Sequence, residues 1–294
     1  MPALAMAIVH PVTETPLKAA ADAAARGMLK PVLVGPLDRI HAAAAQAGID
    51  CSEWHIVEAE HSHEAAETAC DLAASGEVDA LMKGSLHTDE LLRAVLANPR
   101  VRSERRLTHA FVFDDPAYHK PFVVTDGAVN VAPSLAVKAD IARNAIGLVW
   151  ALRGPGGDPP KLAALAAVET VNPDMPATTD AAALAKMGDR GQLGDCLVDG
   201  PLAFDNAISA KAAREKGINS AVAGDPDILL VPNLEAGNML SKQLTFLGEA
   251  DCAGIVLGAR LPIALTSRAD SERTRLLSCA LAMLLAAGGR NDAA

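Results

Sequence analysis

The sequence predicts an α/β protein with mostly parallel sheets. Short apolar runs alternate along the whole chain with Ala-rich stretches of helical spacing, which is the pattern of repeated β–α units. Half of the 294 residues are apolar but only 3% are aromatic, a composition typical of parallel strands covered by Ala-rich helices. Glycines such as Gly27 and Gly48 follow helical stretches, where C-caps are expected. The length allows one large or two ordinary domains.

The first hundred residues contain four strand–helix pairs. Apolar runs predict strands at residues 4–9, 31–34, 54–57 and 80–82. Each run is followed by helical spacing, at residues 17–26, 37–47, 64–74 and from 88 onward. Thr88 gives the fourth helix an N-cap, and Asp89 and Glu90 give it an acidic first turn.

In the middle of the chain, the first two predicted strands are separated by a turn and not by a helix. Residues 110–113 and 122–125 are separated by the turn-rich segment 114–120, so we expect them to pair. Pro133 and Ser134 begin a long helix that reaches about residue 152, and GPGGDPP at 154–160 is a turn or linker.

The β–α alternation then continues to the end. We expect strands at 162–168, 196–198, 228–231, 255–257 and 261–265, and helices at 180–190, 207–216, 236–247 and from 272. Such alternation favours parallel strands joined by right-handed crossovers.

Bulk properties exclude several classes of protein. A net charge of −10 argues against a nucleic-acid partner, which favours a basic surface. Five scattered cysteines without a CxxC pair are typical of reduced thiols. No apolar run approaches the ~18 residues that cross a bilayer, and the N-terminus lacks a secretion signal. We therefore expect a cytoplasmic protein with no membrane partner.

Polar segments follow several predicted strands directly. They are Lys83-Gly84-Ser85, Asp126-Gly127, Asp199-Gly200-Pro201, the segment from Asn233 to Asn238, and Thr266-Ser267-Arg268. Each alone is ordinary turn chemistry. At equivalent strand ends, however, they predict one polar rim at the carboxyl edge, where α/β sheets bind ligands. Glycines there let a ligand approach the backbone closely.

The junction at residues 254–272 has two interpretations. Ser267-x-x-Asp270 before an apolar run is a possible capping box. Arg268, however, would then stand at the positive end of the helix dipole, which disfavours a cation by roughly 0.3–1 kcal/mol. A bound phosphate would offset that cost and would suit the forked donors of Arg.

Familiar catalytic motifs are absent from the sequence. There is no P-loop, no GxGxxG, no HExxH and no GxSxG. His61 and His63 lack further Cys or His neighbours, so we expect no metal site.

The chain resembles the phosphate acetyltransferase/phosphate butyryltransferase family, and is most similar to its short butyryltransferase-like branch and to the acyltransferase half of bifunctional enoyl-CoA hydratase fusions. The matching segments are MKGSLHTDELLRAVL (82–96), VVTDGAVNVAPSLAVKADIARNAI (123–146), VNPDMPATTDAAALAKM (171–187), DGPLAFDNAIS (199–209), LLVPNLEAGNMLSKQL (229–244) and VLGARLPIALTSRADS (256–271).

The resemblance implies an isocitrate/isopropylmalate-dehydrogenase-like fold of two α/β/α domains with the active site in the interdomain cleft. Domain I would contain residues 1–130 plus 257–294, and domain II residues 131–256. It also implies a homodimer and the reaction acyl-CoA + phosphate ⇌ acyl phosphate + CoA. The acyl group would be acetyl or a short homologue such as butyryl, transferred in a ternary complex with CoA as substrate and without metal or nicotinamide.

By the same resemblance, Ser267 and Arg268 contact the acyl phosphate and stabilise the charge of the transition state. Asp270 is the third catalytic candidate. Contacts to CoA and phosphate are assigned to residues of the polar rim: Lys83, Gly84, Asn233, Glu235, Gly237, Asn238 and Lys242.

Two departures from the family pattern leave the general base open. An Asp that the acetyltransferases carry beyond the Ser-Arg pair falls on Thr274, and an upstream Arg falls on Thr245. Asp270, Glu272 or Glu235 could serve instead, or the thiol could ionise beside Arg268. The alternatives in function are a dehydrogenase of the same fold acting on a small hydroxy acid, and a catalytically weak protein that binds CoA or acyl phosphate.

Overall fold

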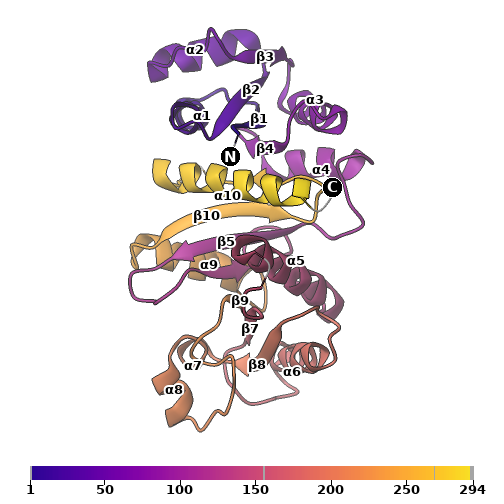
Figure 1. Ribbon diagram of the computed structural model, residues 1–294, viewed down its shortest axis with the longest axis vertical. Coiled ribbons are helices and arrows are strands. Elements are labelled where there is room, and N and C mark those ends of the chain that lie inside the picture. The colour runs from indigo at the N-terminus through magenta and orange to yellow at the C-terminus, as the bar shows by residue number, and fades with distance from the viewer. Residues whose placement is uncertain (1, 155, 268, 292–294) are drawn as a thin grey trace. The chain divides into compact units, whose positions relative to one another are not determined.

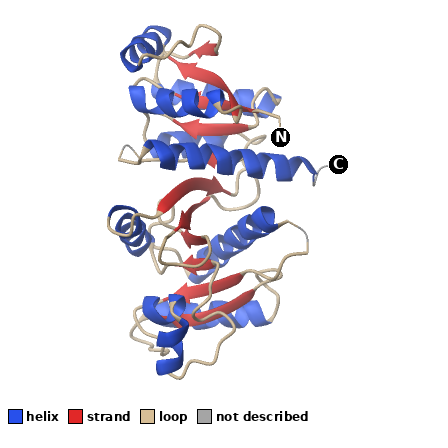
Figure 2. Cartoon of the chain, turned by 60° about the vertical axis from the view of Figure 1, so that its left-hand side comes forward, coloured by secondary structure: helices blue, strands red, loops and turns tan. Residues whose placement is uncertain are grey.

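The computed structural model describes residues 2–154, 156–267 and 269–291. It divides into two compact units, one formed by the residues up to 105 and from 253 onward, the other by residues 106–252. Within each unit the strands form a central layer with helices on both sides (Figure 2). The domain boundaries expected near residues 130 and 256 stay a prediction. Residues 106–130 belong to the second compact unit and residues 253–256 to the first.

The first unit is built on a mostly parallel sheet in the order β3-β2-β1-β4-β11-β10. Its parallel strands are β1 (Leu4–Val9), β2 (Leu29–Gly35), β3 (His55–Glu58), β4 (Ala80–Lys83) and β11 (Ile263–Ala264). β10 (Asp251–Leu257) runs antiparallel to β11. β1, β4 and β11 are almost wholly buried, which explains why their sequences are continuous apolar runs.

The helices of this unit lie on two faces because the strand order reverses at β1. The chain moves outward from β1 to β3 through α1 (Glu14–Ala25) and α2 (Leu37–Ala47), then returns through α3 (Ser62–Ser75) to β4. Right-handed crossovers then place α3, with α4 (Thr88–Ala97) packed on it, opposite α1 and α2 (Figure 1). The last helix, α10 (Glu272–Asn291), packs on α1, β4 and β11. The carboxyl ends of β1 and β4 therefore form a topological switch point.

The second unit has a sheet in the order β5-β6-β9-β7-β8. β6 (Phe122–Thr125), β9 (Ile228–Leu230), β7 (Lys161–Leu165) and β8 (Leu197–Leu202) are parallel, while β5 (Thr108–Asp114) pairs antiparallel with β6. Its helices are α5 (Leu135–Arg153), α6 (Pro176–Asp189), α7 (Phe204–Ile208), α8 (Ala210–Glu215) and α9 (Leu234–Phe246). In Figure 1, α5 and α6 lie on one side of this sheet.

The core of the second unit holds a large share of the chain's few aromatic rings. The Phe113 ring lies 5.8 Å from that of Phe122 and 6.0 Å from that of Phe111, and Tyr118 meets Phe122 edge to face at 5.3 Å. Val124, Leu165, Leu202 and Leu229 belong to the same buried cluster. The β5–β6 hairpin thus contributes aromatic packing that the Ala-rich remainder lacks.

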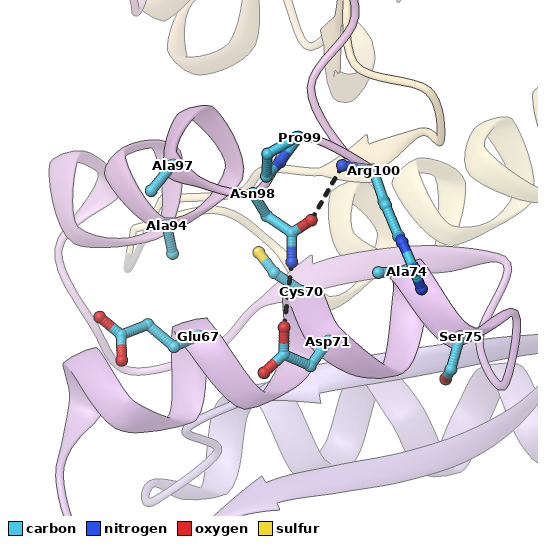
Figure 3. Close-up of a pocket in the computed structure, with 10 residues that line it drawn as sticks. All are labelled: Glu67, Cys70, Asp71, Ala74, Ser75, Ala94, Ala97, Asn98, Pro99 and Arg100. Carbon is cyan, nitrogen blue, oxygen red and sulfur yellow. Dashed lines mark hydrogen bonds between the residues drawn. The ribbon is translucent and has the colours of Figure 1, made fainter.

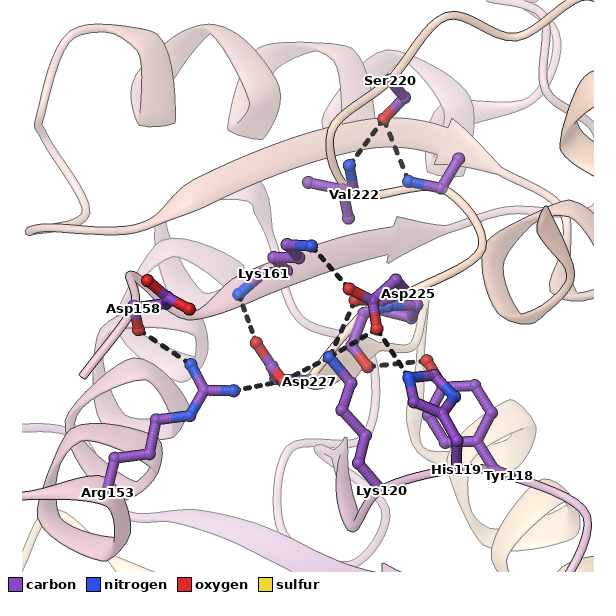
Figure 4. Close-up of polar contacts among 12 residues, drawn as sticks. Tyr118, His119, Lys120, Arg153, Asp158, Lys161, Ser220, Val222, Asp225 and Asp227 are labelled. Atoms are coloured by element: carbon purple, nitrogen blue, oxygen red, sulfur yellow. Dashed lines mark hydrogen bonds and ion pairs between the residues drawn. The ribbon is translucent and has the colours of Figure 1, made fainter.

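A network of ion pairs ties the amino ends of the parallel strands in this unit (Figure 4). Asp227, just before β9, accepts a 2.8 Å hydrogen bond from the backbone N–H of Lys161 in β7 and is only 3% exposed. Asp225 pairs with the Lys161 ammonium at 2.5 Å and is hydrogen-bonded to Nε2 of His119 at 2.9 Å. Two further cations reach the same carboxylates: Lys120, which contacts both, and Arg153, which pairs with Asp227. The network lies at the edge opposite the polar rim, and its role here is structural.

The α/β fold predicted from the sequence is confirmed, with local differences. The helix expected at 207–216 is two short helices, because the Ser209 side chain accepts a hydrogen bond from Ala212 N–H and starts α8 anew. The strand expected at 261–265 has only two residues, and β10 and β5 depart from the parallel arrangement. None of the described helices combines the length and hydropathy that a bilayer-crossing segment requires.

Candidate active site

The loop that follows β11 leaves the sheet beside the loop that follows β4. The two strands pair in parallel, with Ile263 opposite Leu81 and Ala264 opposite Met82. Two residues further on, Thr266 and Ser267 follow β11 just as Gly84 and Ser85 follow β4. Two predicted segments of the polar rim are therefore neighbours at the carboxyl edge of the first unit.

Hydrogen bonds hold the backbone of Ser267, and its side chain is exposed. Its N–H donates to Oδ2 of Asp270 at 2.5 Å, and its carbonyl oxygen accepts from the N–H of Asp270 at 3.3 Å. The hydroxyl oxygen accepts from the N–H of Ala269 at 3.3 Å. Because that bond uses a lone pair of Oγ, the hydroxyl hydrogen remains able to donate to an incoming oxygen.

Arg275 holds the same loop from the helix side. It lies in the first turn of α10, only 4% exposed, and donates from Nη1 to Oγ1 of Thr266 at 3.0 Å and from Nη2 to the carbonyl oxygen of Ser267 at 2.5 Å. Burial lowers the pKa of Arg275 from its ordinary value, while the charge of Asp270 acts in the opposite direction. The sequence prediction missed this residue. The signal was present, because a cation in the first turn of a helix opposes the dipole just as Arg268 was expected to do.

The capping-box interpretation of Ser267 and Asp270 needs correction. The two residues do exchange the hydrogen bonds of a capped turn, but that turn precedes α10. The helix itself is capped by Ser271, whose hydroxyl accepts from the N–H of Thr274 at 3.0 Å and whose carbonyl accepts from the N–H of Arg275 at 3.2 Å. Capping of α10 therefore does not explain Ser267.

Thr274 occupies the position where the family pattern led us to expect a carboxylate. Its side chain is buried, and its hydroxyl lies 3.0 Å from that of Ser271. The hydroxyl is thus engaged within the first turn of α10. A general base, if the reaction uses one, has to come from another position.

Lys83 and Gly84 end β4, and the glycine has a structural explanation. A Cβ on Gly84 would lie 2.2 Å from the carbonyl oxygen of Val9 and 2.9 Å from that of His10. The Gly84 N–H donates to that Val9 oxygen at 3.0 Å. The sequence suggested that this glycine lets a ligand approach the backbone. In the structure it is the end of β1 that approaches the backbone of Gly84 closely. Lys83 is 8% exposed at the end of the strand.

In the second unit, the turn after β6 is organised by Asp126. This buried carboxylate accepts from the N–H groups of His109, Ala128 and Val129 at 2.9–3.1 Å and from Nδ2 of Asn130 at 2.6 Å. Four donors on one carboxylate fix the turn rigidly. We therefore interpret Asp126 as a structural residue.

The start of α9 packs directly on that turn. A Cβ on Gly237 would lie 2.9 Å from Cα of Gly127, and Asn238 donates from Nδ2 to the Gly127 carbonyl at 3.3 Å. Asn233 caps α9, because its Oδ1 accepts from the N–H of Ala236 at 2.9 Å. Three residues assigned to CoA thus have structural contacts, whereas Glu235 and Lys242 have exposed side chains.

The predicted site residues consequently form two groups, each within its own unit. Ser267 and Asp270 share one loop, next to the strand that ends at Lys83 and Gly84. The second group surrounds the Asp126–Gly127 turn. Arg268 lies outside the described residues, so its part in the site stays a prediction.

A groove elsewhere in the first unit lies between α3 and α4 (Figure 3) and has a volume of about 630 Å³. Its described lining includes none of the predicted site residues. Asn98 spans one side of it, donating from Nδ2 to Asp71 at 3.0 Å and accepting from the Arg100 N–H at 3.0 Å. These contacts hold the end of α4 on α3.

Three of the five thiols have the properties of inert cysteines. Burial raises the pKa of Cys70 and Cys279 to about 12 and that of Cys196 to about 11. Nucleophilic cysteines have lowered values instead. Among the described residues, no group of three or more His, Cys, Asp or Glu side chains is arranged to hold a metal ion.

Comparison with known proteins decides the family. Residues 59–283 match the family described as phosphate acetyl/butaryl transferase. The chain belongs to this family. It is a phosphate acyltransferase, an enzyme that moves an acyl group reversibly between CoA and phosphate.

Two named relatives refine this membership. The phosphate acetyltransferase of Rhizobium meliloti is 52% identical over 284 residues, which cover 96% of this chain and 89% of that protein. The phosphate butyryltransferase of Clostridium acetobutylicum is 42% identical over 286 residues, covering 97% and 92%. These two relatives do not support the expectation that the chain lies nearer the butyryltransferase-like branch.

Solved structures confirm the fold. A branched-chain phosphotransacylase from Enterococcus faecalis superposes with a TM-score of 0.84 at 29% identity, covering 96% of this chain and 99% of that one. A putative 4-hydroxythreonine-4-phosphate dehydrogenase from Salmonella typhimurium reaches 0.59 at 14% identity. The second likeness shows the dehydrogenase-like fold alone.

Proposed function

We propose that this phosphate acyltransferase uses acetyl groups and transfers them directly between CoA and phosphate. In the thioester-forming direction, the CoA thiolate attacks the carbonyl carbon of acetyl phosphate. A C–S bond forms, the bond between the acetyl carbon and the bridging oxygen breaks, and phosphate leaves with that oxygen. Higher identity to the named acetyltransferase than to the named butyryltransferase supports the acetyl group.

The observation that carries the proposed site is the fixed backbone and exposed hydroxyl of Ser267. Negative charge develops on the carbonyl oxygen in the tetrahedral transition state, and a donor already aimed at that position lowers the barrier. The Ser267 hydroxyl can donate while its oxygen remains bonded to Ala269 N–H. Arg268, the next residue, is proposed to contact the phosphate and to stabilise the same charge.

We assign Asp270 to the catalytic loop as the residue that holds Ser267, and not as the base. Its carboxylate accepts from the Ser267 N–H at 2.5 Å. The thiol proton is then released to solvent, since a thiol has several per cent thiolate near neutral pH and the charge of Arg268 favours that ion. The raised pKa values of Cys70, Cys196 and Cys279 agree with transfer that involves no acyl-cysteine.

Three of the remaining predicted residues, Lys83, Glu235 and Lys242, keep their assignments as proposals. Lys83 and Lys242 are cations suited to phosphate or to the pyrophosphate of CoA. Glu235 is assigned to the same group of residues that contact CoA. The structural contacts of Gly84, Asn233, Gly237 and Asn238 make these residues supports for the rim. We also propose a cytoplasmic homodimer.

The test is thioester formation from CoA with acetyl, propionyl and butyryl phosphate, in buffer with chelator and without nicotinamide. We expect turnover with all three and the highest kcat/KM for acetyl phosphate. Because one CH₂ contributes only about 1–3 kcal/mol of discrimination, the preference should be about 10- to 200-fold. Higher kcat/KM with butyryl phosphate would overturn the acetyl assignment. CoA binding without turnover would favour the binding-protein alternative.

A further inference from the structure

Arg275 has an environment that the stability of α10 does not explain. A buried guanidinium loses its hydration, and a cation in the first turn of a helix is opposed by the dipole. Arg275 nevertheless lies 96% buried at that position, and its two forked nitrogens point out of the helix, toward the loop that precedes it. The side chain therefore serves the loop more than it serves the helix.

The contacts of Arg275 fix two consecutive residues. Nη1 reaches the side-chain hydroxyl of Thr266 at 3.0 Å, and Nη2 reaches the main-chain carbonyl of Ser267 at 2.5 Å. That carbonyl belongs to the peptide bond that joins Ser267 to Arg268. Because the guanidinium is planar and rigid, two bonds from its two nitrogens fix the orientation as well as the distance.

Asp270 completes the arrangement from the other end of the same residue. Its carboxylate accepts from the Ser267 N–H at 2.5 Å, while Arg275 donates to the Ser267 carbonyl. The Asp270 carboxylate therefore binds the backbone N–H of Ser267, and the Arg275 guanidinium binds its backbone carbonyl. The main chain of Ser267 is thus restrained on both sides, and its side chain is left exposed.

We propose that Arg275 is a positioning residue of the acyl-transfer site, which holds the Thr266 side chain and the Ser267 backbone so that the Ser267 hydroxyl meets the reacting carbonyl. This inference rests on the proposed function of Ser267. Positioning matters because misplacement of a catalytic group by about 1 Å costs on the order of 100-fold in rate.

The experiment compares three variants of the full-length protein. Arg275→Met removes the donors but keeps much of the volume, and Arg275→Lys keeps the charge but offers a single nitrogen. Ser278→Ala is the matched control. Ser278 lies on the same helix and is fully buried, and its two bonds, to the Thr274 carbonyl at 2.7 Å and from the Gly254 N–H at 2.9 Å, do not involve residues 266–270.

Two measurements are made on each variant. Steady-state kinetics with CoA and acetyl phosphate give kcat and KM, corrected for the folded fraction. Hydrogen–deuterium exchange of the peptides that contain residues 265–271 reports the loop directly, without reference to activity.

We expect Arg275→Met to lower kcat at least 10-fold, with both KM values changed less than threefold, and to speed exchange of the loop at least 10-fold. Arg275→Lys should give intermediate values. Ser278→Ala should keep kcat within twofold and leave loop exchange unchanged. If Arg275→Met does not fold, Arg275→Lys decides, with an expected threefold or larger loss of kcat and faster exchange.

The inference is overturned if loop exchange is unchanged in the Arg275 variants, or if their kcat matches that of Ser278→Ala. A wild-type protein without transfer activity would contradict the proposed function only. Loop exchange in that case still decides whether Arg275 holds the loop.

Discussion

The N–H of Ser267 and the carboxylate of Asp270 are 2.5 Å apart and close a turn just before α10. This hydrogen bond separates two roles that the sequence left open for Asp270. A carboxylate bonded to the main chain of Ser267 restrains the loop, whereas a general base has to reach the thiol of CoA.

Replacement of Asp270 by Asn tests these two roles. An amide oxygen can still accept from the Ser267 N–H but cannot accept a proton at neutral pH. We expect Asp270→Asn to keep kcat within about threefold of the wild type, since general-base catalysis contributes about 10²–10⁴-fold. Initial rates across pH 6–9 provide the measurement. A loss of 100-fold or more would make Asp270 the base.

Two serines, four residues apart, should separate activity from stability. Ser267→Ala should lower kcat by about 100-fold, because it removes a donor aimed at developing charge. Ser271→Ala should cost about 1 kcal/mol of unfolding free energy, because it removes the cap of α10. Urea unfolding and steady-state rates of both variants are the measurements. If Ser267→Ala lost stability and kept its rate, the capping interpretation of Ser267 would return.

Arg268→Ala should lower kcat/KM by about 10²–10³-fold, which is about 3–4 kcal/mol of transition-state stabilisation. The exposed Arg93, which pairs with Asp89 on α4, provides a control, since Arg93→Ala should leave the rate unchanged. Turnover by Arg268→Ala near that of the wild type would remove Arg268 from the mechanism.

The start of α10 shows what the sequence could predict and what it could not. Periodicity predicted the β–α alternation well, because Ala-rich helices and buried strands differ strongly in spacing. It could not choose between Ser267 and Ser271 as the cap, since both precede the same apolar run. The hydrogen bonds that Ser271 accepts from the N–H groups of Thr274 and Arg275 distinguish them.

Two glycines show the same limit of prediction from the sequence. Gly84 and Gly237 were assigned to ligand approach because small residues at strand ends allow it. In the structure the close neighbours are the carbonyl oxygen of Val9 and the backbone of Gly127. A sequence shows that a residue must be small, but the fold decides which neighbour requires it.

The acid stability of the protein should depend on Asp225. Burial alone would raise the pKa of this carboxyl, but hydrogen bonds from Lys120, Lys161 and His119 outweigh it and hold the pKa well below the ordinary value. A lowered folded-state pKa stabilises the protein above the unfolded value of about 3.9, and this stabilisation is lost as pH falls below it.

We therefore expect Asp225→Asn to reduce the free energy of unfolding by about 1 kcal/mol between pH 5 and 8, because partly exposed ion pairs are screened by solvent. The difference from wild type should shrink as pH falls from 4 toward 2. Urea unfolding at each pH provides the measurement. A difference that is constant down to pH 2 would contradict the ion-pair explanation.

An apolar patch on α9 is the surface we expect in a homodimer. Met239 and Phe246, seven residues apart on α9, are each 66% exposed, and Leu247, the C-cap of this helix, is 80% exposed; exposed apolar patches mark interaction surfaces. The double substitution Phe246→Glu, Leu247→Glu should convert a dimer of about 61 kDa, twice the 30.3 kDa chain, into monomers, because each copy would bring two charges into the interface. Light scattering after gel filtration measures this mass.

Leu96→Glu, at a half-exposed position on α4, is the control and should leave the mass unchanged. A dimer that survives the double substitution would place the interface elsewhere, and a wild-type monomer would contradict the homodimer itself.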